Sequence, residues 1–248
     1  MGARVLLRIF LRTYVVGATF NTKGMQNVGF ALVMEPGLVD LYGHDPAALQ
    51  RARSRYLKHY NTHPFWTPLL AGIFLSMEKK IASGLLPADI LLKLRSTTVY
   101  TLSALGDSFF GGSSLVLWSL VGINLAVSGH ILPLVLWLFL CFCLLQAFKV
   151  YTFARGYAQG LSFLQRLKSW NLIDWGQRIK MANAALIALF VLQIAPGEGF
   201  WLLAWAAGAS LLAAGSVLRS PARCFWIAVV ILVGLFAPWN LVLPLVSM

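Results

Sequence analysis

Long apolar runs separated by short basic segments fill the second half of the chain. The run at residues 131–148 approaches the about 20 residues that a helix needs to cross the hydrocarbon core of a membrane. Similar apolar runs occupy residues 181–195, 200–218 and 224–243. This pattern predicts an all-α integral membrane protein, with about four transmembrane helices in this half.

The longest apolar stretch, residues 97–129, is interrupted by Gly106-Asp107-Ser108 and then by Gly111-Gly112-Ser113-Ser114. A carboxylate at membrane depth is costly and usually faces a protein interior or a watery cavity. One interpretation is a continuous helix whose small residues pack against a neighbour, with Asp107 near the interface. We favour a central helix broken at Gly106-Asp107-Ser108 beside a path for a polar solute, because about 33 residues exceed a straight crossing.

The first 60 residues are basic and amphipathic. Arg4, Arg8 and Arg12 recur every four residues, so they share one face of a helix whose other face is apolar. This predicts a helix in the cytoplasmic membrane interface and not a cleaved leader, which needs an unbroken apolar run. Residues 45–59 predict a second amphipathic helix, with Asp45 as its N-cap. Residues 1–60 are therefore expected to form amphipathic and interfacial helices.

Polar residues stand at the ends of two further apolar segments. Asn27 is near the start of a helix predicted to break at Pro36-Gly37, and its amide suits a hydrogen bond to a neighbouring helix. Residues 64–77 follow His63 and are too short for a full crossing, which predicts a short re-entrant helix. His63 has three interpretations: a helix cap, a proton carrier or a ligand donor.

The distribution of Lys and Arg predicts the orientation of the chain in the membrane. Residues 149–180 are the longest basic stretch between apolar runs and are expected in the cytoplasm, as are residues 219–223. Residues 196–199 contain no basic residue and are expected outside. The N-terminus is then cytoplasmic and the C-terminus outside. Residues 61–195 are expected to form the membrane core, and residues 196–248 a C-terminal transmembrane hairpin.

Composition supports a membrane protein and narrows its function. Hydrophobic residues make up 59% of the chain and charged residues 11%, whereas soluble domains carry about 25% charged residues. The net charge of +12 suits loops near anionic lipid, and no nucleic-acid-binding pattern is present. Among the eight acidic residues, no two lie three or four apart on one apolar helix, which disfavours a membrane enzyme with a carboxylate-held metal. No metal or cofactor site is predicted.

Five segments in a fixed order carry a resemblance to a known family. They read NTKGMQNVGFALVMEPGLVDLY, RYLKHYNTHPF, Met77-Glu78-Lys79, ALGDSFFGG and ARGYAQG. Together they resemble the IID membrane component of the mannose/fructose/sorbose-type phosphotransferase systems. Each segment alone is a weak signal, but the shared order covers about residues 13–195.

The resemblance implies a non-catalytic sugar-permease subunit in the bacterial cytoplasmic membrane. Such a chain pairs with a IIC chain, in assemblies of several copies, to form the translocation path. The soluble IIB protein then phosphorylates the hexose-type sugar after relay from IIA. Amides and carboxylates suit sugar hydroxyls because they donate and accept hydrogen bonds. The implied substrate-binding residues are Asn27, Asn61, His63, Glu78, Asp107 and Ser108.

Three departures from the family pattern keep a second interpretation open. The approach to Gly106 lacks the usual proline and glycines, Lys79 replaces the second residue of an acidic pair, and the outer segment 196–199 is short. The alternative is a degenerate member that acts as a scaffold or regulator of the complex without transport.

Overall fold

The computed structural model of the chain describes residues 1–194, 205, 207, 208 and 211. Within these residues the elements are helices, together with isolated β-bridges from Met25 to Asn21 and to Tyr60. The predicted all-α class is therefore confirmed for this part of the chain. The predicted hairpin at residues 196–248 lies outside the described residues.

The chain divides into two compact units, which are described separately. Unit 1 comprises Met1–Ser108 and Cys143–Leu172, and unit 2 comprises Phe109–Phe142 and Ile173–Met248. Among the described residues, two helical stretches are long and apolar enough to cross a membrane. These are Ala88–Val127 and Ile131–Gln159. The first contains most of the span predicted at residues 97–129, and the second contains all of the span predicted at residues 131–148.

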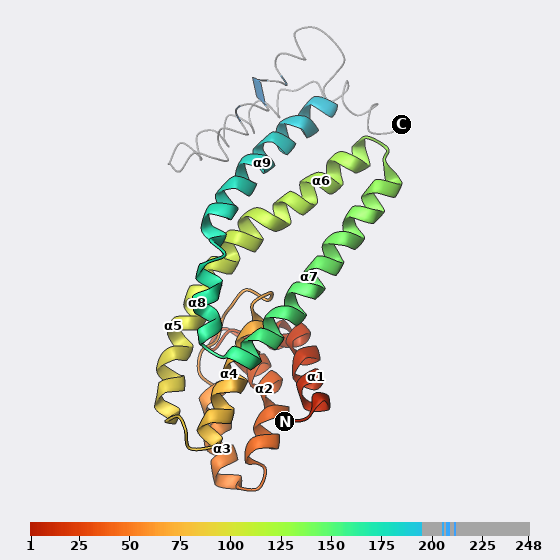
Figure 1. Ribbon diagram of the computed structural model, residues 1–248. Helices are drawn as coiled ribbons and strands as arrows, with labels where there is room; N and C mark the ends of the chain where they lie inside the picture. Colours follow the sequence, from red (N-terminus) through yellow and green to blue (C-terminus); the bar gives the residue numbers. More distant parts are fainter. Residues whose placement is uncertain (195–204, 206, 209–210, 212–248) are drawn as a thin grey trace. The chain divides into compact units, whose positions relative to one another are not determined.

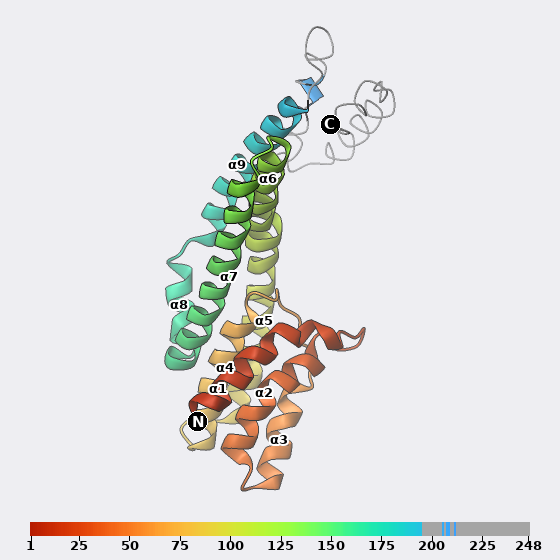
Figure 2. The same ribbon diagram turned by 90° about the vertical axis from the view of Figure 1, so that its right-hand side faces the viewer.

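Unit 1 begins with the predicted basic helix. In α1 (Ala3–Arg12) the arginines are exposed and Ile9 is buried. A 3-10 helix (Thr13–Thr19), α2 (Asn27–Tyr42) and α3 (Pro46–Tyr56) follow. The predicted N-cap of α3 is confirmed, because Asp45 Oδ1 accepts a hydrogen bond from the backbone N–H of Ala48 at 2.9 Å. Figures 1 and 2 show these helices grouped with α4.

The predicted break at Pro36-Gly37 is wrong, since α2 continues through Pro36 to Tyr42. A proline inside a helix removes the hydrogen bond to the carbonyl four residues earlier, here that of Leu32. Arg12 Nη1 donates to this Leu32 oxygen at 2.8 Å. The guanidinium thus supplies the donor that the proline lacks, and the helix is maintained.

Helix α4 (Thr67–Ala82) forms the centre of unit 1 and corresponds to the short helix predicted at residues 64–77. Its residues from Thr67 to Leu75 are all buried. A helix that is apolar on all sides is one that is surrounded, by lipid or by protein. Here much of the surrounding is protein: α4 packs against α1, α2, the 3-10 helix and α5 (Ala88–Gly106). The apolar run of α4 is too short to cross a membrane because the helix is buried in the core of unit 1.

The second half of α7 (Ile131–Gln159) approaches α4 so closely that their backbones touch. A Cβ on Gly72 would lie 2.8 Å from the Tyr157 nitrogen, and one on Gly156 would lie 2.7 Å from the Leu69 oxygen. Both glycines therefore permit this packing, in the way that small residues do in membrane bundles. The short helix α8 (Ser162–Lys168) follows in the same unit.

The predicted break at Gly106-Asp107-Ser108 is a π-helical segment, Asp107–Ser114, and not an interruption of the helix. It joins α5 to α6 (Leu115–Val127), and α6 belongs to unit 2 with α9 (Leu172–Gln193). Asn183 on α9 donates to the Ser113 oxygen at 3.0 Å. Gly176 brings α9 within contact distance of Ser113 and Phe109. Support from α9 explains how the widened turn is stabilised.

We expect Arg12→Met to lower the stability of the chain by about 1 kcal/mol, because the Leu32 carbonyl loses its donor. The measurement is denaturant unfolding of the purified chain in detergent micelles. Arg8→Met is the matched control, since Arg8 is exposed on the same helix. Equal effects of the two substitutions would contradict the role of Arg12.

Candidate functional site

The structure brings His63 and Asp107 together in unit 1. Gly106 is buried, and a Cβ on it would clash with the His63 side chain and lie 2.8 Å from Trp66 Cδ1. The end of α5 therefore packs against the turn that precedes α4. Asp107 and Ser108 follow directly and are both exposed. Close packing at Gly106 thus sets the position of Asp107 beside His63, and Ser108 follows in the chain.

The His63 imidazole is half-buried and held locally. Its Nδ1 accepts a hydrogen bond from the backbone N–H of Phe65 at 3.3 Å, and its ring packs edge-on against Phe65. Burial lowers the pKa of His63 below its usual value of 6.5, and the Asp107 carboxylate partly opposes this shift. The pair consists of an exposed carboxylate next to an imidazole that favours the neutral form. Such a pair can both accept and donate hydrogen bonds.

Asn27 lies close to this site in the fold, but its side-chain amide is used in hydrogen bonds within the protein. Its Nδ2 donates to the Leu57 oxygen at 2.6 Å, and its Oδ1 accepts from Asn21 Nδ2 at 2.9 Å. The adjacent Gln26 accepts from the Thr62 N–H at 3.4 Å and donates its own N–H to the Tyr60 oxygen at 2.8 Å. These bonds attach the segment that carries Asn61 and His63 to the start of α2.

Asn61 is half-buried on that segment, between the buried side chains of Tyr60 and Thr62. Its place in the chain, two residues before His63, keeps it near the His63–Asp107 pair. Four of the six candidate residues, Asn61, His63, Asp107 and Ser108, therefore belong to one region of unit 1 and are at least partly accessible. We refer to these four residues as the polar group.

Glu78 lies near the other end of α4, about 16 Å along the helix from Thr67 at 1.5 Å per residue. Its carboxylate is fully buried and accepts four side-chain hydrogen bonds. Arg55 donates from Nε at 3.0 Å and from Nη2 at 2.5 Å, and the hydroxyls of Tyr42 and Tyr56 each donate at 2.8 Å. Glu78 is thus separated from the polar group and closed to a solute in this structure.

The environment of Glu78 also affects its partners. Burial, reinforced by the Glu78 charge, raises the pKa of the Tyr42 hydroxyl far above its usual value. The hydroxyl therefore remains a hydrogen-bond donor at any pH at which the protein is used. A buried carboxylate with a bidentate guanidinium and two phenol donors satisfies its hydrogen-bonding capacity. We conclude that this cluster holds α2, α3 and α4 together.

Sequence reasoning missed the roles of Arg55 and of two asparagines in unit 2. Arg55 lies within the amphipathic helix predicted at residues 45–59, but its side chain is only 10% exposed and pairs with Glu78. Asn124 on α6 donates to the Leu186 oxygen of α9 at 3.2 Å, and Asn183 donates to Ser113. For both asparagines, the signal available in the sequence was a single amide inside an apolar run.

In the part of the chain that the structure describes, no group of three or more His, Cys, Asp or Glu side chains could hold a metal.

Comparison with known proteins gives a consistent set of relatives. The model of the phosphotransferase-system mannose/fructose/sorbose family IID component matches residues 2–193. The chain is 27% identical to the fructose permease IID component of Bacillus subtilis over 190 residues, which are 75% of this chain and 66% of that protein. It is 27% identical to the mannose-specific EIID component of Escherichia coli K12 over 185 residues, 74% of this chain and 64% of that protein. The matches therefore span slightly less than two thirds of these two relatives.

Two solved structures are similar in fold. The cryo-EM structure of the mannose transporter ManYZ in complex with microcin E492 has a TM-score of 0.60 at 24% identity, covering 87% of this chain and 68% of that chain. A second structure, described as a membrane protein, has a TM-score of 0.67 at 24% identity and covers 77% and 70%. At this level of identity the likeness concerns the fold.

We expect Glu78→Gln to destabilise the chain by about 3–5 kcal/mol, because it leaves the Arg55 charge buried without a counter-charge. Unfolding in detergent micelles measures the loss. Glu35→Gln is the control: the Glu35–Arg53 pair is 30% and 43% exposed, so its loss should cost no more than about 1 kcal/mol. If the two variants were equally stable, Glu78 would not hold the three helices together.

The lowered pKa of His63 predicts a dependence of stability on pH. As pH falls below about 6.5, the unfolded chain takes up this proton before the folded chain does, so folding loses stability towards acid. His63→Gln should therefore reduce the loss of thermal stability between about pH 7 and about pH 5. Melting curves in detergent across this range test it, with His44→Gln as the control. A His63→Gln profile that follows the wild type would contradict the burial effect.

Proposed function

This chain belongs to the mannose/fructose/sorbose family of phosphotransferase-system IID components, and we propose that it forms, with a IIC membrane chain, the path of a hexose-type sugar across the bacterial cytoplasmic membrane. It is a transport subunit and carries no phosphorylation step itself. The soluble IIB protein phosphorylates the sugar on the cytoplasmic side after receiving the phosphoryl group from IIA. Several IIC–IID pairs form the assembly.

The observation that carries this proposal is that two residues of the polar group, Asp107 and Ser108, lie on a membrane-length helix. Asp107 and Ser108 are exposed within the stretch Ala88–Val127, at the start of the π-helical segment. Charged side chains at membrane depth usually mark a solute path or a watery cavity, and π-helical turns are frequent at functional sites. An exposed carboxylate, a hydroxyl and an imidazole offer donors and acceptors that match sugar hydroxyls.

Within this proposal the six candidate residues have two kinds of role. Asn61, His63, Asp107 and Ser108 contact the sugar or line its path. Asn27 and Glu78 hold the helices that position them, which is supported by their bonds to Leu57 and Arg55. In this proposal Glu78, which the sequence suggested as a sugar ligand, stabilises the fold. Asp107 is the carboxylate that contacts the sugar.

The proposed orientation places the N-terminus in the cytoplasm and the C-terminus outside. Its support is the basic segment 149–180, since loops rich in Lys and Arg remain on the cytoplasmic side. The exposed arginines of α1 suit the same side, where they meet anionic lipid headgroups.

A scaffold or regulator that binds IIC without moving sugar is the second candidate. It is favoured by Lys79, which stands where the family pattern has a second acid, and by the structural use of Glu78 and Asn27. In that case the polar residues serve assembly.

We expect Asp107→Asn to lower sugar uptake about tenfold or more in proteoliposomes that contain the assembled complex, because a charge-assisted hydrogen bond to a hydroxyl is lost. Asp89→Asn is the control, since Asp89 is exposed on the same helical stretch and lies before the apolar part. Its uptake should match the wild type. Uptake that is unchanged in both Asp107→Asn and His63→Ala would reject the assignment of the site.

A pull-down of the chain from detergent-solubilised membranes separates the two candidates. Both predict a stoichiometric IIC-type chain in mass spectrometry. Transport by the reconstituted complex then supports the permease subunit, whereas an intact complex without transport supports the scaffold. Recovery of the chain without a IIC-type partner would reject both.

A further inference from the structure

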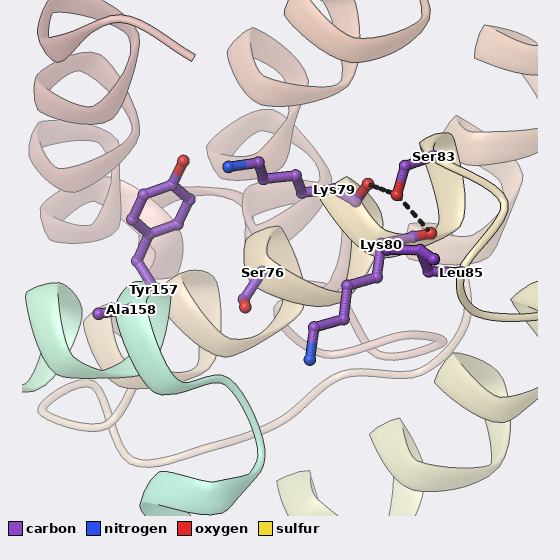
Figure 3. A pocket seen from close by; sticks show the side chains of 7 residues that line it. All are labelled: Ser76, Lys79, Lys80, Ser83, Leu85, Tyr157 and Ala158. Carbon is purple, nitrogen blue, oxygen red and sulfur yellow. Dashed lines mark hydrogen bonds between the residues drawn. The ribbon is translucent and has the colours of Figure 1, made fainter.

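A pocket of about 320 Å³ lies at the C-terminal end of α4 in unit 1. It is lined by Ser76, Lys79, Lys80, Ser83, Leu85, Tyr157 and Ala158. Figure 3 shows the Lys79 side chain extending toward Tyr157, while the Lys80 side chain leaves α4 in a different direction, on the side of Ser76. The polar group is at the opposite end of the helix, so this pocket belongs to a different place in the fold.

The pocket offers positive charge that is not neutralised. Both lysines are exposed, and neither takes part in an ion pair within the described part of the chain. The carbonyl groups of this helix end are already occupied: Ser83 Oγ donates to the oxygens of Lys79 and Lys80 at 3.1 Å each, and the Leu85 N–H donates to Lys80 at 2.9 Å. The negative end of the helix dipole is therefore partly satisfied, and the ammonium groups remain available.

The wall of the pocket that Tyr157 and Ala158 form is held in place by glycines. Gly160 ends α7 in the left-handed region with a φ of 59°, where residues with a Cβ are disfavoured. A Cβ on Gly160 would lie 3.1 Å from Ser76 Oγ. Together with the backbone contact at Gly72 and Gly156, this close approach fixes Tyr157 and Ala158 against α4. The position of the wall formed by Tyr157 and Ala158 is thus set by helix packing, while Ser83 and Leu85 come from the connection that follows α4.

We propose that this pocket binds a phosphate monoester. Two lysines line the pocket, and their combined charge matches that of a phosphate dianion. The hydroxyls of Ser76 and Tyr157 can donate further hydrogen bonds. The volume is near the lower limit of small-molecule sites, at roughly 300 Å³. The Tyr157 ring, Leu85 and Ala158 provide apolar surface for the organic part of the ligand.

The phosphate monoester has two possible sources. One is a soluble sugar phosphate, the product released on the cytoplasmic side, and this source rests on the proposed function. The other is the headgroup of phosphatidic acid in the inner leaflet, since Tyr157 belongs to the basic segment expected there. In either case the bound phosphate links α4 to α7 at the cytoplasmic end.

The first experiment is isothermal titration calorimetry of the purified full chain in a neutral detergent with glucose 6-phosphate, inorganic phosphate and glucose. We expect saturable binding of glucose 6-phosphate, weaker binding of phosphate, and no binding of glucose. The Lys79→Gln/Lys80→Gln double variant should bind glucose 6-phosphate about tenfold more weakly or not at all. The Lys23→Gln/Lys168→Gln variant removes two other exposed lysines, which do not line the pocket, and should bind as the wild type does.

The second experiment tests the lipid source. The melting temperature of the chain is measured in phosphatidylcholine nanodiscs with and without phosphatidic acid. A stabilisation by phosphatidic acid that the Lys79→Gln/Lys80→Gln variant lacks, without binding of glucose 6-phosphate, assigns the site to lipid. The proposal is overturned if neither ligand binds, or if the double variant binds both as the wild type does. Because no IIC or IIB chain is present, a failure of the transport proposal leaves this result unaffected.

Discussion

The buried carboxylate of Glu78 imposes the strongest constraint in unit 1, because a charge without water must be matched by donors. Arg55 and Tyr56 reach it from α3 and Tyr42 reaches it from α2, while Glu78 itself is on α4. Three helices that are separated in the chain are thereby fixed at one point. The next two residues, Lys79 and Lys80, are exposed and border the pocket at the end of α4.

Helix α4 connects two chemically different regions. Its N-terminal end follows the turn at His63, where Gly106 allows α5 to approach and sets Asp107 beside the imidazole. Its C-terminal end carries the lysine pocket. Between them the helix is buried and touches the α7 backbone through Gly72 and Gly156. A displacement of α4 would therefore move both ends together, so the proposed sugar site and the proposed phosphate pocket would be mechanically connected through this helix.

Two irregular helices show how this fold tolerates residues that normally interrupt a helix. Pro36 leaves the Leu32 carbonyl without its usual donor, and Arg12 from α1 supplies one. The π-helical segment Asp107–Ser114 is contacted by α9, whose Asn183 donates to the Ser113 oxygen. In both cases a side chain from another helix replaces or supplements a local backbone bond. The two helix breaks expected from the sequence were therefore wrong for the same reason, since local signals contain no information about distant donors.

The sequence alone determined the class of this protein, because apolar runs of membrane length, the basic balance and the order of five motifs are properties of the chain itself. It also identified the N-cap Asp45 and singled out His63, Asp107 and Ser108, since a charged or polar residue in an apolar run is visible without a structure. Only the tertiary structure showed that Glu78 is buried and that the Asn27 side chain is hydrogen-bonded to Leu57 and Asn21. Burial and hydrogen-bond partners depend on contacts between distant segments, and residues with the same chemistry, such as Glu78 and Asp107, acquire different roles through them.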